Sequence, residues 1–156
     1  MADTLVIIPA FNEEKNIANV IDRLTNTLND VDYVIVNDGS IDSTSKICRE
    51  RGFNIIDLPV NLGLAGAFQT GMKYAYKHGY KYAVQFDGDG QHRPEYIPEM
   101  RKKCEECDIV IVSRFVTKKK PFTPRMLGSR LIALVIKLST GATIHDPTSG
   151  MRMYNE

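Results

Sequence analysis

The sequence predicts an α/β protein whose mostly parallel, twisted sheet is covered by helices on both faces. Short apolar runs of strand length alternate with longer segments of helical period along the 156 residues. The first run, residues 4–8, is continuous and rich in β-branched side chains, as a buried parallel strand requires. Strands that alternate with helices connect through right-handed crossovers, and these generate a mostly parallel sheet.

Each element has its own local signal. Strands are expected over residues 4–8, 33–36, 54–58, 82–86 and 109–112, and helices over residues 17–28, 41–51, 64–78 and 94–104. The first helix follows from apolar residues that recur every three or four positions. Asp42 or Ser43 is a plausible N-cap of the second helix. Gly52 and Gly79 suit the ends of the second and third helices, and Pro94 suits the first turn of the fourth. A further helix is expected over residues 126–138, and no closing element is evident after residue 150.

Composition excludes several classes of protein. Lysine and arginine number 20 against 19 acids, a net charge of +1, so a nucleic-acid partner is not expected. No apolar run approaches the roughly 20 residues of a membrane span, and the N-terminus lacks a signal peptide's basic region. The three cysteines fit a reducing compartment, and the Cys104–Cys107 spacing lacks the context of a redox or zinc site. A cytoplasmic protein is therefore expected.

Polar residues follow each predicted strand. They occupy positions 12–14, 37–40, 61–63, 87–89 and 113–114. In an open parallel sheet, ligands bind outside the carboxyl ends of the strands. We therefore expect these five sets to meet at one edge of the sheet and to form the binding site there.

The strongest chemical signal is Asp87-Gly88-Asp89, directly after a strand. Two carboxylates one residue apart can share a divalent cation, whose shell substrate phosphates and water then complete. Gly88 permits the tight backbone that a diphosphate needs for close approach. Mg²⁺ and Mn²⁺ both suit carboxylate oxygens, and the sequence does not choose between them. The structural alternative is a solvated turn.

Two further acidic positions have both a functional and a structural interpretation. Asp38 can accept hydrogen bonds from a nucleotide base or ribose, but Asn, Asp, Gly and Ser also favour turns. Glu14 lies in the first turn of a predicted helix, where the dipole favours acids. The segment after the first strand lacks the G-x-G-x-x-G of a Rossmann dehydrogenase, so that class is not expected.

Six motifs in this order resemble the family 2 inverting glycosyltransferases of the GT-A fold. They are I-P-A-F-N-E-E at 8–14, V-N-D-G-S at 36–40, N-L-G-L-A-G-A-F-Q-T-G at 61–71, D-G-D-G-Q-H at 87–92, S-R at 113–114 and D-P-T-S-G-M-R at 146–152. Gln91 and His92, together with the last motif, resemble the polyprenyl-phosphate branch, which includes dolichyl-phosphate mannose synthases. The sequence departs from the family at Phe11, where Tyr is usual, and at Asn37, where many members have Asp.

The resemblance implies a role for each matching residue. The positions that would line the nucleotide are Pro9, Phe11, Glu13, Val36 and Asp38. Asp87, Gly88 and Asp89 would hold the metal and diphosphate with help from Gln91, and Arg114 and Arg125 would contact phosphate groups. The chain would be a single domain, with its nucleotide-sugar-binding part at 1–114. Residues 115–156 would begin an acceptor-side part that continues in the family.

The implied reaction is metal-dependent, inverting transfer of a hexose from a nucleotide-diphospho-sugar. A polyprenyl phosphate acceptor would need cations rather than a base, and Arg114, Arg125 and the Lys118–Lys120 run are available. A saccharide hydroxyl acceptor, as in cell-wall or surface polysaccharide synthesis, would need a base, for which Asp146 is the candidate. A module that binds nucleotide-sugar without turnover is the non-enzymatic alternative.

The predicted helix 126–138 carries more apolar surface than one core-facing stripe needs, and basic residues flank it. This combination is typical of a helix lying on an anionic membrane surface. Peripheral contact with the cytoplasmic face of a membrane is therefore expected, and packing against further C-terminal elements is the alternative.

Overall fold

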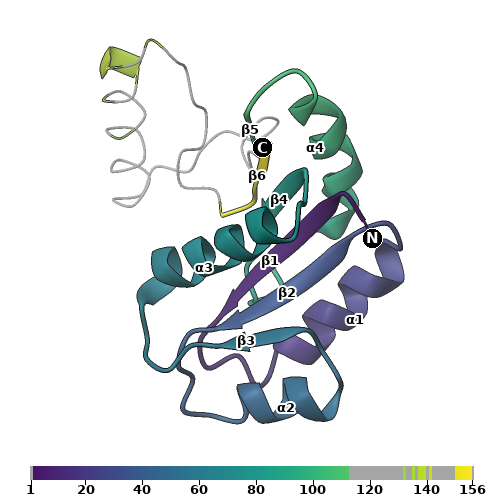
Figure 1. The fold of residues 1–156 in the computed structure, drawn as a ribbon, viewed down its shortest axis with the longest axis vertical. Coiled ribbons are helices and arrows are strands. Elements are labelled where there is room, and N and C mark those ends of the chain that lie inside the picture. The colour runs from purple at the N-terminus through teal and green to yellow at the C-terminus, as the bar shows by residue number, and fades with distance from the viewer. Residues whose placement is uncertain are drawn as a thin grey trace.

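The computed structural model describes residues 2–112, 132, 135, 137–139, 141 and 150–155. In this part of the chain the strands form one six-stranded sheet in the order β3-β2-β1-β4-β6-β5 (Figure 1). The strands are β1 (Thr4–Ala10), β2 (Asp32–Asn37), β3 (Ile55–Asp57), β4 (Tyr82–Gln85), β5 (Ile109–Ile111) and β6 (Arg152–Asn155). The first four pair in parallel, whereas β6 is antiparallel to both β4 and β5. The predicted mostly parallel α/β class is confirmed.

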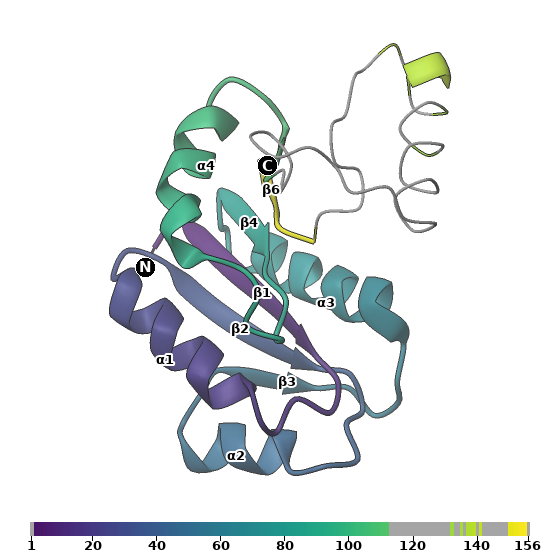
Figure 2. The same ribbon diagram turned by 180° about the vertical axis from the view of Figure 1, so that it is seen from behind.

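Helices cover both faces of the sheet. They are α1 (Ile17–Thr27), α2 (Thr44–Glu50), α3 (Gly63–Lys77), the 3-10 turn η1 (Pro94–Tyr96) and α4 (Ile97–Cys104). Helix α3 lies on one face, and α1, α2 and α4 lie on the other (Figures 1 and 2). Alternate residues of β1 face the two layers: Leu5 and Ile7 pack with α3, and Val6 and Ile8 pack with α1 and α4. A strand that is buried on both faces has to be apolar throughout.

Two helices differ from the prediction, each for a local reason. Helix α2 begins at Thr44 rather than at 41, because residues 41–43 are held in a loop by the segment after β1. The fourth predicted helix is divided into η1 and α4. Pro98 has no N–H to donate to Pro94 four residues earlier, and the Ile97 N–H bonds that carbonyl instead. Gly52 and Gly79 have φ of 68° and 72°, as their predicted roles at helix ends require.

Strand β6 was not predicted. It lies between β4 and β5, with Met153 fully buried and Gln85 paired with Arg152. Four residues are too few for an alternating pattern to stand out, and the partner strand lies far away in the sequence. This pairing places Gly150, from the last motif, beside the end of β4. The predicted helix 126–138 lies mostly outside the described residues.

Candidate functional site

The loops after β1 and β2 are joined by hydrogen bonds at the carboxyl edge of the sheet. The Asn12 N–H donates to Ser40 Oγ at 2.9 Å, and the Ile41 N–H donates to Asn12 Oδ1 at 3.0 Å. Asn12 has a φ of 57°, in the left-handed region that a short polar side chain tolerates. The predicted convergence of polar loops is confirmed here for the first two of the five sets, and Asn12 takes part in both of these bonds, whereas residues 113–114 lie outside the described residues.

Glu14 belongs to the same network of hydrogen bonds between the β1 and β2 loops. Its N–H donates to Asp42 Oδ2 at 3.1 Å, and its Oε2 accepts from the Ser43 N–H at 3.1 Å. The neighbouring Glu13 N–H donates to Thr44 Oγ1 at 2.9 Å. Glu14 therefore has a structural role, but the cause is a bond to another loop and not only the dipole of its own helix. Glu13, bonded through its backbone, keeps its side chain near the site.

Asp38 anchors a third loop. Its side chain is 3% exposed, and Oδ1 accepts from the Leu62 N–H just before α3 at 2.7 Å. Gly39 has a φ of 68°, and a β-carbon there would lie 2.8 Å from Asn61 N, so only glycine allows the two loops to meet. Asp38 thus holds together the two loops that border the site. Its contact with a nucleotide stays a prediction.

The hydrogen bonds of residue 37 explain why it is asparagine and not aspartate. Asn37 is 3% exposed and donates from Nδ2 to Asp57 Oδ1 at 2.7 Å, while its Oδ1 accepts from the Ser40 N–H at 3.3 Å. Asp57 is also ion-paired with Arg49. Burial pushes the pKa of Asp57 upward, but hydrogen bonds from Asn37, Ser45 and Arg49 outweigh burial and leave that pKa below its ordinary value.

We expect Asn37→Asp to destabilise the fold at pH 7 by about 1–3 kcal/mol, because a carboxylate would replace the donor to Asp57. Two facing carboxylates raise the pKa of the pair, so stability should return as the pH falls and the pair takes up a proton. Urea unfolding at pH 7 and pH 4 measures this. The double variant Asn37→Asp/Asp57→Asn restores one donor and should recover stability at pH 7. Equal unfolding of the single variant and the wild type would contradict the account.

The turn after β4 brings the paired acids to the same edge. Gly88 is buried, and a β-carbon there would lie 3.2 Å from the Pro9 carbonyl and 3.6 Å from Glu13 Cγ. Glycine at 88 is therefore favoured by the close approach of the β1 loop, a reason that the sequence did not reveal. Asp89 is exposed, and its Oδ1 accepts from the N–H of Gln91, also exposed, at 2.9 Å.

The two oxygens of the Asp87 carboxylate have different surroundings. Among the described residues, Oδ1 is buried without a hydrogen-bond partner, whereas Oδ2 lies 3.3 Å from His92 Nε2. A buried carboxylate oxygen without a donor requires an explanation, and a cation supplies one. The described part of the chain holds no group of three or more His, Cys, Asp or Glu side chains suited to a metal. A cation that takes one or two carboxylates together with phosphate does not need such a group.

The remaining predicted residues fall into three groups. Phe11 is 47% exposed, so its ring is available to a ligand at the edge. Pro9 and Val36 are buried, and the Val36 side chain is 0% exposed, beneath the site and not on its surface. Arg114, Arg125, Lys118–Lys120 and Asp146 lie outside the described residues.

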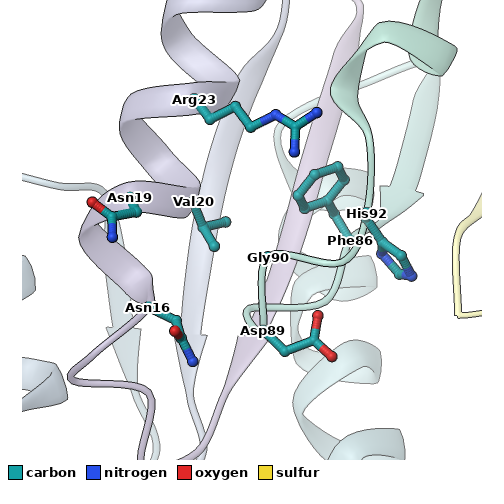
Figure 3. Close-up of a pocket in the computed structure, with 8 residues that line it drawn as sticks. All are labelled: Asn16, Asn19, Val20, Arg23, Phe86, Asp89, Gly90 and His92. Carbon is teal, nitrogen blue, oxygen red and sulfur yellow. The ribbon is translucent and has the colours of Figure 1, made fainter.

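A pocket of about 230 Å³ opens between α1 and the loop that follows β4 (Figure 3). It is lined by Asn16, Asn19, Val20, Arg23, Phe86, Asp89, Gly90 and His92. Arg23 at its rim is paired with Glu95 at 3.0 Å, and Asn16 donates to Glu13 Oε2 at 2.8 Å. The sequence assigned no role to Arg23, Asn16 or His92. Only the Q-H pair after D-x-D drew attention to His92.

A mostly parallel sheet that presents paired acids after β4, opposite the loops of β1 and β2, is the GT-A arrangement of nucleotide-sugar transferases. The chain belongs to glycosyl transferase family 2, whose family model matches residues 5–156. The resemblance inferred from the motifs is thereby confirmed.

Two curated relatives are lipid-phosphate sugar transferases by name. The UDP-N-acetylglucosamine–dolichyl-phosphate N-acetylglucosaminyltransferase of Methanococcus voltae is 34% identical over 100% of this chain and 71% of its own length. The undecaprenyl-phosphate mannosyltransferase of Micrococcus luteus is 29% identical over 96% of this chain and 65% of its own. The chain thus spans about two thirds of the length of such relatives.

A solved structure shares the fold. Glucosyl-3-phosphoglycerate synthase from Mycobacterium tuberculosis, in complex with Mn²⁺, UDP-glucose and phosphoglyceric acid, superposes with a TM-score of 0.72. The match has 20% sequence identity and covers 97% of this chain and 56% of the other. At this identity, the likeness concerns the fold.

Proposed function

We propose that this chain carries the donor-binding and catalytic part of an inverting, metal-dependent hexosyltransferase that uses a nucleotide-diphospho-sugar and a polyprenyl phosphate. Residues 1–114 form the donor part, and residues 115–156 begin the acceptor side. The observation that carries the proposal is the Asp87 carboxylate, one oxygen of which is buried and has no donor among the described residues, at the edge where the β1 and β2 loops meet.

Asp87 and Asp89 hold the divalent cation, Mg²⁺ or Mn²⁺. A cation bound there would supply Lewis-acid chemistry, because its charge would offset that of the departing nucleoside diphosphate. Phe11 offers its exposed ring to the base, and Asp38 keeps the adjoining loop in place. The complex of the related fold with Mn²⁺ and UDP-glucose supports a divalent cation and a nucleotide-sugar as the groups bound at this site.

The acceptor assignment draws on the names of the relatives, which specify dolichyl and undecaprenyl phosphates. A phosphate acceptor is already anionic, so Arg114, Arg125 and Lys118–Lys120 serve as its cations and no strong base is needed. No helix within the described residues has the length and apolar character to cross a membrane. Ile132, Val135 and Leu138, three residues apart, are 47%, 56% and 78% exposed, which favours peripheral contact with a lipid surface.

The test is transfer of radiolabelled sugar in the presence of Mn²⁺. UDP- and GDP-hexoses are offered with undecaprenyl phosphate in vesicles, or with a soluble saccharide. We expect labelled, solvent-extractable lipid, and none when the vesicles lack the phosphate. Label in the saccharide alone would replace the proposal with a hydroxyl acceptor and Asp146 as base. Donor binding without transfer to either would indicate a module that only binds.

A further inference from the structure

The imidazole of His92 contacts the same residue, Asp87, at two places. The Asp87 backbone N–H donates to His92 Nδ1 at 2.9 Å. On the other side of the ring, Nε2 lies 3.3 Å from Asp87 Oδ2, the outer end of hydrogen-bonding distance. The ring therefore spans the backbone and the carboxylate of one acidic residue.

The first contact determines where the ring carries its proton. A backbone N–H can only donate, so Nδ1 has to be an unprotonated acceptor. The neutral ring then carries its hydrogen on Nε2, the atom that faces Oδ2. His92 consequently presents an N–H at 3.3 Å from one oxygen of the carboxylate, and the other oxygen, Oδ1, is the one buried without a partner among the described residues.

The surroundings keep the ring in this orientation. His92 is 15% exposed, and its ring meets the Phe86 ring edge-on at a centroid distance of 5.4 Å. Gly150 closes the other side: a β-carbon there would overlap Asp87 Oδ2 and lie 3.0 Å from His92 Cε1. Gly150, two residues before strand β6, thus lies against the Asp87–His92 pair, and any larger residue there would displace it.

We infer that His92 is a positioning residue that fixes the rotation of the Asp87 carboxylate so that Oδ1, which lacks a donor among the described residues, is left as the oxygen for the divalent cation. The inference rests on the proposed function, in which Asp87 is a metal ligand. A donor that contacts the oxygen of a carboxylate that does not bind the metal orients the other oxygen toward the metal. Loss of such a partner typically lowers metal affinity by about 10–100-fold.

Two substitutions separate the two contacts. The amide oxygen of asparagine is as many bonds from Cβ as Nδ1, so His92→Asn keeps an acceptor for the Asp87 N–H but loses the donor to Oδ2. The amide nitrogen of glutamine is as many bonds from Cβ as Nε2, so His92→Gln keeps the donor and loses the acceptor. A purely structural histidine would be better replaced by asparagine, and a positioning histidine by glutamine.

The measurement is Mn²⁺ binding, followed by the electron paramagnetic resonance signal of free Mn²⁺, with UDP and separately with GDP present. We expect His92→Asn to bind Mn²⁺ about 10–100-fold more weakly than the wild type, and His92→Gln to stay within about threefold of it. Urea unfolding of each variant reports stability separately. His92→Asn with wild-type affinity, or glutamine and asparagine variants that lose affinity equally, would overturn the inference.

The variant Asp87→Asn separates a failure of the proposed metal site from a failure of the positioning role of His92. If the wild type and Asp87→Asn bind Mn²⁺ alike with both nucleotides, Asp87 is not a ligand, and the proposed metal site fails together with the inference. If Asp87→Asn loses binding while His92→Asn does not, only the positioning role fails. A metal-free readout is the ¹⁵N spectrum of the His92 ring. A proton on Nε2 is the expected result, and one on Nδ1 would overturn the inference.

Discussion

Asp89→Asn should remove most of the gain in nucleoside diphosphate affinity that Mn²⁺ provides, while the protein stays folded. Asp89 is exposed, and the one bond described for its side chain, from the Gln91 N–H at 2.9 Å, can be kept by the amide oxygen of asparagine. The substitution therefore removes charge and leaves the turn in place. A charged hydrogen-bonding or ligating group contributes about 1.5–3 kcal/mol, which corresponds to about 10- to 100-fold in affinity.

Calorimetry with UDP and GDP, each with and without Mn²⁺, measures the effect. The matched control is Asp30→Asn, which makes the same chemical change between α1 and β2, at the opposite edge of the sheet, where Asp30 is paired with Arg101 at 2.7 Å. The control should titrate like the wild type. If Asp89→Asn also does so with Mn²⁺ present, Asp89 has no part in holding the cation.

Gly71→Ala should destabilise the protein by about 1–3 kcal/mol, the usual cost of inserting atoms into a well-packed core. Gly71 is buried where α3 crosses β1, and a β-carbon there would overlap Ile7 Cγ2 and lie 3.0 Å from Ile7 Cγ1. On an exposed helix surface the same change would stabilise by about 1 kcal/mol through helix propensity. The sign of the effect thus distinguishes packing from propensity.

Urea unfolding of Gly71→Ala, Ile7→Ala and the double variant forms a complete cycle. Ile7→Ala removes the two γ-carbons that the new methyl group meets, so the double variant should be more stable than the sum of the single effects predicts. Additive losses would mean that the clash at Ile7 is not the cause. Stabilisation by Gly71→Ala alone would mean that α3 moves away from β1 at little cost.

The motif that contains Gly71 shows that a family signature can include residues that act through the packing of the fold as well as residues of the site. N-L-G-L-A-G-A-F-Q-T-G supports the family resemblance, yet Gly71 acts through contact with Ile7 in the core. Asn12, Glu14 and Asp38 likewise have bonds to other loops. From the sequence, Glu14 and Asp38 each had a functional and a structural interpretation, and the structural bonds of both are to partners 24 to 29 positions away, while the contact of Asp38 with a nucleotide stays a prediction.

The sequence by itself determined the class of fold, the places of the first five strands along the chain and the family. Apolar periodicity and strand-end motifs are local, and β1 to β4 pair in the parallel manner that alternating helices impose. It also determined that Asp87 and Asp89 follow a buried strand, because both lie within a few residues of it.

Only the tertiary structure decided how the last motif comes to lie beside Asp87, the first of the two acids after β4. Strand β6 has four residues and inserts antiparallel between β4 and β5, far from either in sequence. That pairing sets Gly150 against Asp87 and His92. No local pattern encodes such a contact, because its stability comes from burying Met153 and from completing the hydrogen bonds of two strands that are already formed.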